Sequence, residues 1–235
     1  MSLPHLDCLP NEKAADKLVL QTLEDYATSH PHIDILEAGC GRRWPYKLDG
    51  FDYRLTGIDI DAEALRIRKE DVGDLDEIVH SDLHKARFGE AQFDVIYSSY
   101  VLEHVYGVDA LLGLFHKWLK PGGLLVIKVP DYQSVYGLIT RITPHKFHIF
   151  YKRYFRGLRN AGKPGYGPYP TVHERAIARG PFHEFLSSNA MTMLQERGYG
   201  TLPGMQKHVS NTIGALTFGA YAGGHYNLLY ISQKA

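Results

Sequence analysis

With 235 residues, 44% of them hydrophobic, the chain is long enough to bury a normal core and short enough to form one domain. Lysine plus arginine and aspartate plus glutamate number 26 each, so the balanced charge gives no field that would attract a polyanion. The two cysteines, Cys8 and Cys40, lie far apart in different contexts and predict neither a disulfide framework nor a zinc site.

The amino-terminal stretch predicts no export signal. Residues 1–10 (MSLPHLDCLP) lack both the basic region and the apolar core of a secretory signal. No apolar run approaches the roughly 18 residues that would span a bilayer. We therefore expect a soluble, cytoplasmic protein.

The first predicted helix and strand lead into a glycine-rich turn. Residues 11–28 carry apolar side chains near helical spacing and are followed by Pro31, so we expect an amphipathic helix that covers a sheet. The short apolar run Ile33–Leu36 predicts a buried strand, which stops at residues 37–41 (EAGCG). Glycines just past a strand let the backbone approach a ligand, because no Cβ blocks the way and positive φ is accessible.

The second predicted strand, Arg54–Ile58, is followed directly by a carboxylate. Asp59 lies 20 positions after Gly39. In doubly wound sheets a carboxylate at about that spacing reaches the neighbouring strand end and binds a ribose hydroxyl. The pattern predicts a nucleoside pocket at the carboxyl edge of a parallel sheet, although a plain βαβ unit with a tight turn would share it.

The turn departs from the dinucleotide fingerprint G-x-G-x-x-G. That fingerprint needs a glycine at position 44, where the chain has Trp44. Pro45 pushes Trp44 out of the helical region, and only four residues separate the proline from Gly50. The helix that usually follows such a turn should therefore be short or missing.

The middle of the chain predicts two further strands. We expect a helix over residues 62–69, capped by Asp61, which could also touch the ribose, and then a weak strand at Glu77–His80. Asp82 follows that strand, and its carboxylate could accept a hydrogen bond from an exocyclic amine or serve only in the turn. The apolar run Phe93–Ser99 predicts a central strand.

A specific series of motifs comes after that strand. It consists of YVLEHV at 100–105, a helix over Leu111–Leu119, a KPGG turn at 120–123 and an apolar strand at 124–130. In this order, and after the glycine turn, these motifs resemble those of the class I S-adenosylmethionine (SAM)-dependent methyltransferases. The chain departs from that family at Arg43, where a further glycine is common.

The resemblance covers about residues 11–130 and 182–235. It implies an α/β fold with a Rossmann-like, mostly parallel seven-stranded sheet, an antiparallel last strand and helices on both faces. Residues 131–181 lie outside the resemblance. They would form a lid, inserted after the fifth strand of a single domain that spans residues 1–235.

The resemblance also implies SAM as the cofactor and assigns its contacts. Gly39 and Gly41 would admit the methionine part, with Glu37 near its amino group. Asp59 would hold the ribose and Asp82 the adenine. The full set of expected cofactor contacts is Glu37, Gly39, Cys40, Gly41, Asp59, Ile60, Asp82, Leu83 and Ser98.

The expected lid has an unusual composition. Residues 132–173 contain seven lysines and arginines and no acidic residue. Aromatic side chains within 147–158 recur at helical spacing, and PGYGPYP at 164–170 predicts a constrained loop. The helix could pack on the core, enclose a hydrophobic or aromatic acceptor with an acidic group, or touch a membrane surface through 145–159. The neutral overall charge makes nucleic acid the weakest partner.

Towards the carboxyl end the pattern predicts four elements. They are a helix over Phe182–Gly198, a short strand around Leu202–Met205, a helix over Val209–Tyr221 and a final strand at Tyr226–Ser232. In the family resembled, the final strand runs antiparallel between its neighbours.

Three histidines are candidate catalytic residues. An acceptor hydroxyl needs a base, and histidine titrates near neutrality. His104 lies just past the fourth of these strands, while His173 and His183 flank the exit of the lid. A structural role is the alternative for each. In some members of the family the Glu-His pair helps bind a metal with a further glutamate, but Tyr100 stands at that position, so we expect no metal.

The function implied is methyl transfer from SAM to a small-molecule acceptor, at an oxygen nucleophile. The same fold could instead hold SAM as a structural cation for a non-methyl reaction such as cyclisation. A non-enzymatic SAM-binding module, with the lid as its contact surface, is the remaining alternative.

Overall fold

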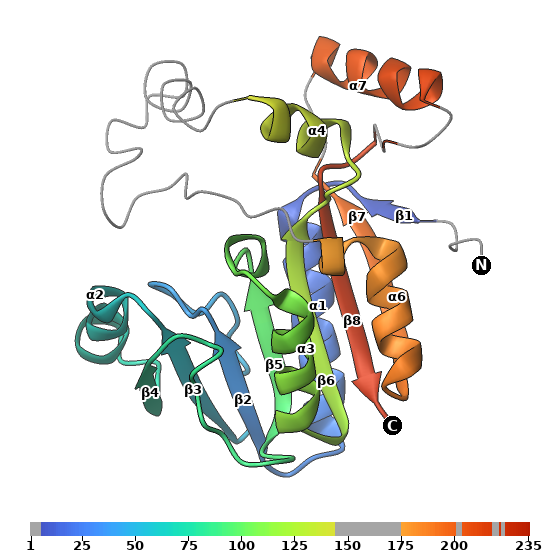
Figure 1. The fold of residues 1–235 in the computed structure, drawn as a ribbon. Coiled ribbons are helices and arrows are strands. Elements are labelled where there is room, and N and C mark those ends of the chain that lie inside the picture. Colours follow the sequence, from blue (N-terminus) through green and yellow to red (C-terminus); the bar gives the residue numbers. More distant parts are fainter. Residues whose placement is uncertain (1–5, 144–174, 201–203, 218–220, 222–223) are drawn as a thin grey trace.

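The computed structural model describes residues 6–143, 175–200, 204–217, 221 and 224–235 (Figure 1). The expected lid helix within 147–158, the constrained loop and His173 lie outside these residues. Among the described helices, none is both long and apolar enough to cross a bilayer.

One sheet organises the described residues, with strands in the order β1-β7-β8-β6-β5-β2-β3-β4. The strands are β1 (Asp7–Leu9), β2 (Ile33–Ala38), β3 (Tyr53–Asp59), β4 (Glu77–His80), β5 (Phe93–Ser99), β6 (Leu119–Pro130), β7 (Met191–Tyr199) and β8 (Asn227–Lys234). β8 is antiparallel to its neighbours β6 and β7, and the remaining pairs are parallel. This arrangement confirms the Rossmann-like sheet, to which the short edge strand β1 adds an eighth strand.

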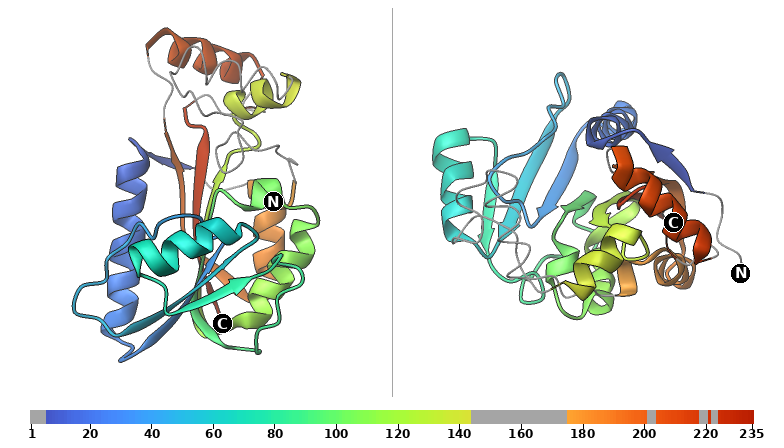
Figure 2. Two further views of the ribbon diagram at one scale, coloured as in Figure 1. Left: turned by 90° about the vertical axis from the view of Figure 1, so that its left-hand side faces the viewer. Right: turned by 90° about the horizontal axis from the view of Figure 1, so that it is seen from above.

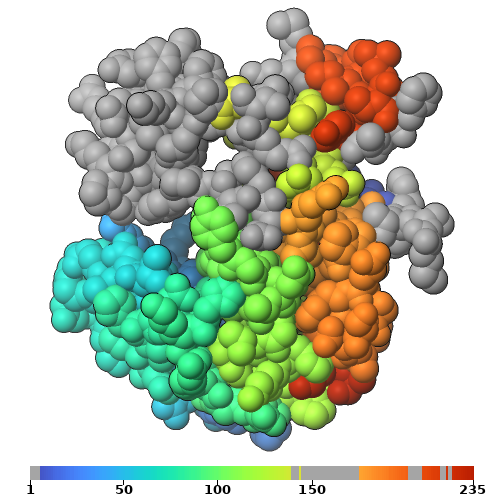
Figure 3. All heavy atoms as spheres, viewed as in Figure 1, coloured from blue at the N-terminus to red at the C-terminus, as the bar shows by residue number. Residues whose placement is uncertain are grey.

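Helices cover both faces of the sheet (Figure 2). The helical elements are α1 (Glu12–Thr28), α2 (Ala62–Arg66) with its π-helical continuation η1 (Ile67–Val72), the 3₁₀ turn η2 (Leu102–His104), α3 (Val108–Trp118), α4 (Val135–Ile142), the 3₁₀ turn η3 (Arg175–Ile177), α6 (Arg179–Ser188) and α7 (Gly204–Leu216). α1 lies on one face (Figure 2), while α3 and α6 lie side by side on the other (Figure 3). α4 and α7 touch each other beyond the carboxyl end of β6 (Figure 1).

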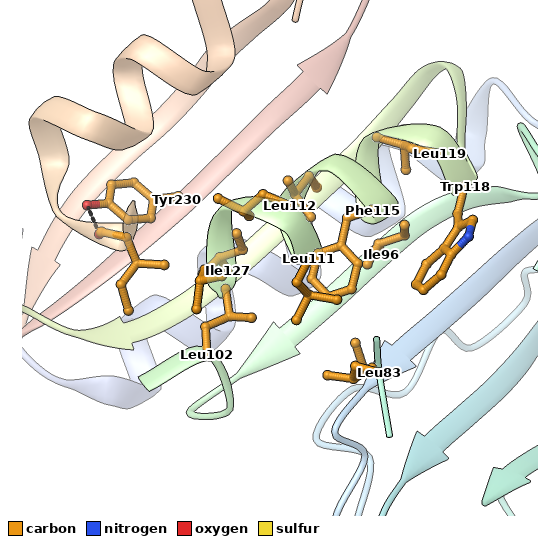
Figure 4. Packing of buried hydrophobic residues seen from close by; sticks show 14 of the residues in the cluster. Leu83, Ile96, Leu102, Leu111, Leu112, Phe115, Trp118, Leu119, Ile127 and Tyr230 are labelled. Atoms are coloured by element: carbon orange, nitrogen blue, oxygen red, sulfur yellow. Dashed lines mark hydrogen bonds between the residues drawn. The ribbon is translucent and has the colours of Figure 1, made fainter. Parts of the chain in front are cut away.

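Two apolar layers hold the sheet between these helices. Leu111, Phe115 and Trp118 of α3 pack against Ile96 of β5 and Ile127 of β6 (Figure 4). On the opposite face, buried side chains of α1 pack against apolar residues of β2, β3, β5, β6 and β8. β5 is buried from Phe93 to Ser98, as a central parallel strand with both faces covered should be.

The helix expected to be short or missing after the glycine turn is missing. Residues 39–52 run from β2 to β3 without a helix. Tyr46 and Leu48 are buried against the α1 face, and Trp44 packs beside them. The rings of Trp44, Tyr46 and Tyr97 meet nearly at right angles, with centroids 5.1–5.4 Å apart. Loop side chains thus fill the space of the absent helix.

The helix predicted over Phe182–Gly198 is wrong in its second half. α6 ends at Ser188, Ala190 takes a positive φ of 51°, and Met191–Tyr199 forms β7. The local sequence MTMLQER suits a helix, but pairing along its whole length with β8 decides the conformation.

Other boundaries differ from the predictions by several residues. α7 begins at Gly204 and ends at Leu216, so Gly204 and Met205 are helical where a strand was expected. α3 begins at Val108, three residues before the predicted start. The KPGG residues at 120–123 belong to β6, which follows α3 without a separate turn. Asn11 and Asp61 cap α1 and α2 through their side chains, and for Asp61 this confirms the expected cap.

Candidate functional site

Four parallel strands end together at one edge of the sheet. Glu37 lies opposite Tyr97 of β5, Ala38 lies opposite Ile58 of β3, and Asp59 lies opposite His80 of β4. The chain passes from β2 to β3 on one side and later returns to β5 on the other. Open α/β sheets bind ligands at such a switch point, outside the carboxyl ends of the strands.

The glycine turn crosses this switch point in a left-handed conformation. Gly39 and Gly41 have φ angles of 77° and 54°, which favour glycine. The amide of Gly39 donates to the Ile58 carbonyl over 2.9 Å, so the turn is tied to β3. A Cβ at Gly39 would overlap the side chain of Val101, whereas a Cβ at Gly41 would meet open space. The turn is thus packed against the segment after β5 on one side and open on the other.

Asp59 is fixed at the end of β3 by two backbone amides. The amide of Gly41 donates to Oδ2 and that of Asp61 donates to Oδ1, both over 2.9 Å. A carboxylate oxygen has two lone pairs, so each oxygen of Asp59 can accept a further hydrogen bond. The carboxylate is therefore oriented in advance to receive hydroxyl donors.

The neighbouring strand end is joined to Asp59. The amide of Ser81, directly after β4, donates to the Asp59 carbonyl over 3.1 Å. Ile60 is 71% exposed, so an apolar side chain lies at the surface next to the Asp59 carboxylate. Asp82 is exposed and accepts from the His84 amide over 2.8 Å, while Leu83 is buried in the core. The structure thus brings Asp59, Ile60 and the loop with Asp82 to one edge.

A buried arginine supports the turn from below. Arg68 of η1 is fully buried and donates from Nη1 to the Cys40 carbonyl over 2.8 Å. Its Nε lies 2.7 Å from Asp74 Oδ1, and its Nη1 lies 2.9 Å from Glu37 Oε2. Burial raises the pKa of Glu37 to about 8, and the Arg68 guanidinium opposes that rise. Burial also raises the pKa of the Cys40 thiol to about 12, so this cysteine stays neutral.

Sequence reasoning missed Arg68, although a signal existed. Arg68 lies four residues after Ala64 and three after Leu65, which are both buried. A charged residue on the apolar face of a helix must find a buried partner. That position could have predicted an arginine under the glycine turn.

Two buried side-chain oxygens, Ser98 Oγ of β5 and Glu103 Oε2 of η2, have no hydrogen-bond partner in the part of the chain that the structure describes. Buried acceptors of this kind are normally satisfied. The amino group of an amino-acid ligand would supply donors here, so the residues present fit the methionine part of SAM.

The segment after β5 carries His104 and Glu103. Tyr100 has a positive φ of 56°, and its amide donates to the Lys128 carbonyl, which turns the chain into η2. The His104 side chain is 28% exposed, and its Nε2 lies 3.9 Å from Glu103 Oε1. Glu103 is buried, which raises its pKa to about 7.

A second polar network, also missed, holds this turn in place. Lys128 Nζ is buried 2.7 Å from Asp16 Oδ1 of α1 and lies 5.6 Å from the ring centroids of Tyr100 and Tyr199. The hydroxyls of these two tyrosines share a hydrogen bond of 2.7 Å. The side-chain amide of Asn227 donates to the Tyr100 hydroxyl. The left-handed Tyr100 is thus anchored on both sides.

His183 does not join the group at the strand ends. Its Nε2 lies 3.2 Å from Glu196 Oε2 of β7, and Arg179 binds the same carboxylate over 2.7 Å. β6 and β8 lie between β7 and β5 in the sheet. Among the described residues, no group of three or more His, Cys, Asp or Glu side chains could hold a metal ion.

A glycine turn and an oriented acidic strand end at the switch point define a nucleoside-binding, Rossmann-like protein. Residues 36–127 match the family model described as a methyltransferase domain. A SAM-dependent methyltransferase from Mesorhizobium loti shares the fold, with a TM-score of 0.57 and 16% identity over 94% of this chain and 98% of that one. Residues 36–127 thus match a methyltransferase domain, and the described fold is that of SAM-dependent methyltransferases.

Two further similarities frame the question of function. The chain is 33% identical over 102 residues to phosphoethanolamine N-methyltransferase 3 of Arabidopsis thaliana, covering 41% of this chain and 21% of that protein. The chain thus spans about a fifth of the length of that relative. The cyclase SpnF shares the fold with a TM-score of 0.56 and 13% identity, over 99% of this chain and 88% of that one.

Proposed function

We propose that this chain transfers a methyl group from SAM to a small-molecule acceptor. The observation that carries the proposal is the Asp59 carboxylate, oriented by the amides of Gly41 and Asp61 at the switch point of a methyltransferase fold. Its free lone pairs suit the two ribose hydroxyls of the cofactor.

The remaining cofactor contacts follow from the positions around Asp59. The exposed Ile60 would pack on the adenine, and Asp82 would accept from the adenine amino group. The glycine turn would pass along the methionine part, with Glu37 and Ser98 accepting from its donors. Cys40 and Leu83 are buried, so they would contribute backbone and shape rather than side-chain hydrogen bonds.

When bound, SAM supplies a methyl group that its sulfonium already activates. The chain has to bind, align and exclude water. Holding the acceptor in line with the methyl group contributes roughly 7–11 kcal/mol to lowering the barrier. His104, partly exposed beside the turn, is the proposed base that takes the acceptor's proton. His173 remains a second proposal for that role, whereas the Glu196 contact of His183 supports a structural role there.

The atom that accepts the methyl group is the finer part of the proposal. The sequence analysis favours oxygen, whereas the name of the Arabidopsis relative gives nitrogen. Both atoms carry a proton that must leave, so a base at His104 serves either case. We propose a hydrophobic or aromatic acceptor with an acidic group, which the basic segment 132–173 would meet.

The test of cofactor binding compares two aspartates that lie two residues apart. Asp59→Ala should weaken SAM binding at least tenfold, on the order of 1.4 kcal/mol, in titration calorimetry. The control is Asp61→Ala, which removes the α2 cap and should lower stability by about 1 kcal/mol while leaving the affinity for SAM unchanged. Equal affinity in wild type and Asp59→Ala would overturn the assignment.

A cyclase or other non-methyl reaction is the second candidate, because SpnF shares the fold. The two candidates differ in stoichiometry. Methyl transfer yields one S-adenosylhomocysteine for each product molecule, whereas a structural SAM is not consumed. A binding module would hold SAM without turnover on any acceptor tested.

A further inference from the structure

Glu103 is a buried carboxyl that pairs with no lysine or arginine among the described residues. It is 6% exposed, and within the same part of the chain its Oε2 has no hydrogen-bond partner. Within the described residues, no lysine or arginine makes an ion pair with it; the one such contact is His104 Nε2, 3.9 Å from Oε1. The nearby buried cations are already paired, Arg68 with Glu37 and Asp74, and Lys128 with Asp16 and Glu12.

The position of Glu103 is tied to the glycine turn. Val101, two residues earlier, fills the space that a Cβ at Gly39 would need. η2 also packs against β6, the strand that carries Lys128. The titratable groups on these adjoining elements are Tyr100 and His104 beside Glu103, Lys128 on β6 and Glu37 before the turn. Glu103 therefore belongs to the segment that packs against the glycine turn, along which the methionine part of the cofactor would pass.

A carboxyl in this setting is poised between two charge states. Burial raises the pKa of Glu103 to about 7, so the group is largely neutral below that pH when no cation is near. A cation brought close would favour the carboxylate and lower the pKa. SAM carries a fixed positive charge on sulfur, and its product S-adenosylhomocysteine does not.

We propose that Glu103 is the counter-charge of the sulfonium and that it releases a proton when SAM binds. The O–H bond of the acid breaks, the proton passes to the buffer, and the carboxylate faces the sulfonium. After the methyl group leaves, sulfur is neutral and the carboxylate takes a proton back from solvent. Glu103 would thus favour the substrate form of the cofactor over the product form. This inference rests on the proposed function.

The experiment counts protons by titration calorimetry of SAM and of S-adenosylhomocysteine, each in two buffers of different ionisation enthalpy. At about pH 6, SAM should release close to one proton more than S-adenosylhomocysteine does, because Glu103 is then largely protonated in the free protein. At that pH the amino group of either ligand is protonated and its carboxylate is ionised, so a proton from Glu37 cancels in the difference.

Two variants assign the proton to its source. Glu103→Gln should abolish the difference between the ligands, and His104→Asn should keep it. A difference that persists in Glu103→Gln, or disappears in His104→Asn alone, overturns the assignment, as does equal release by both ligands in the wild type. Failure of both ligands to bind would instead overturn the proposed function, and this inference with it.

Discussion

Two parts of this edge differ in whether their buried polar side chains have hydrogen-bond partners. The nucleoside side is the end of β3 with Asp59, and the methyl side is the end of β5 and η2 with Ser98 and Glu103. On the nucleoside side Asp59 is held by two amides, and its strand is joined to the next through Ser81. On the methyl side Ser98 and Glu103 are buried with oxygens that find no partner in the described part of the chain. A satisfied set of groups is ready for its ligand without rearrangement, while the unsatisfied groups mark where a ligand must supply partners.

The largest expected effect comes from removing the arginine that supports the glycine turn between the two sides. Arg68→Met should lower stability by about 3–5 kcal/mol in urea unfolding at neutral pH, because it leaves Glu37 and Asp74 without their cation. Arg66→Met is the matched control. Arg66 is exposed and makes only surface ion pairs, so its loss should change stability by less than about 1 kcal/mol. Equal effects of the two substitutions would contradict a role for Arg68 under the turn.

The second expected effect is a pH dependence of stability that comes from Glu103 on the methyl side. Folding raises the pKa of Glu103 from 4.5 to about 7, so the unfolded chain loses this proton first. Wild-type stability should therefore fall relative to Glu103→Gln between about pH 4.5 and pH 7, by on the order of 3 kcal/mol, and stay level above. Unfolding curves across this range measure the difference.

An exposed glutamate supplies the control for that pH series. The Glu90 side chain is 76% exposed and makes a surface ion pair, so Glu90→Gln should change stability by less than about 1 kcal/mol. If Glu103→Gln also follows the wild type, the carboxyl of Glu103 is not held in a low-dielectric setting.

Two glycine substitutions test the boundary between the two sides. Gly39→Ala should lower stability by about 1–2 kcal/mol for the left-handed backbone and by about 1–3 kcal/mol more for the overlap with Val101. Gly41→Ala meets open space and should show only the backbone effect. Thermal unfolding measures both. Adding Val101→Ala to Gly39→Ala should restore part of the loss, and no rescue would mean that the turn is not packed on this segment.

The sequence predicted the order of strand, glycine turn and acidic strand end because these signals are local. Strand, glycine turn and acidic strand end follow one another within residues 33–59, and parallel pairing of consecutive strands brings their ends together. Trp44 and Pro45 likewise predicted that the helix after the glycine turn would be short or missing. Each of these features depends on neighbours in the chain rather than on distant partners.

The features that the sequence missed depend on distant contacts. β7 is a strand because it pairs with β8, about 35 residues further on, although its residues suit a helix. Lys128 can be buried because its ammonium group pairs with the carboxylate of Asp16, more than a hundred residues earlier. His183 appeared free for catalysis until the structure placed it beside Glu196. No pattern of neighbouring residues in the sequence predicts these pairings.

The most direct measurement is a crystal structure of the chain with S-adenosylhomocysteine. The account predicts the ribose hydroxyls within hydrogen-bond distance of the Asp59 carboxylate, the adenine on Ile60 and the sulfur on the side of Glu103. A ribose bound away from Asp59, or a ligand outside the edge formed by β2, β3, β4 and β5, would contradict it.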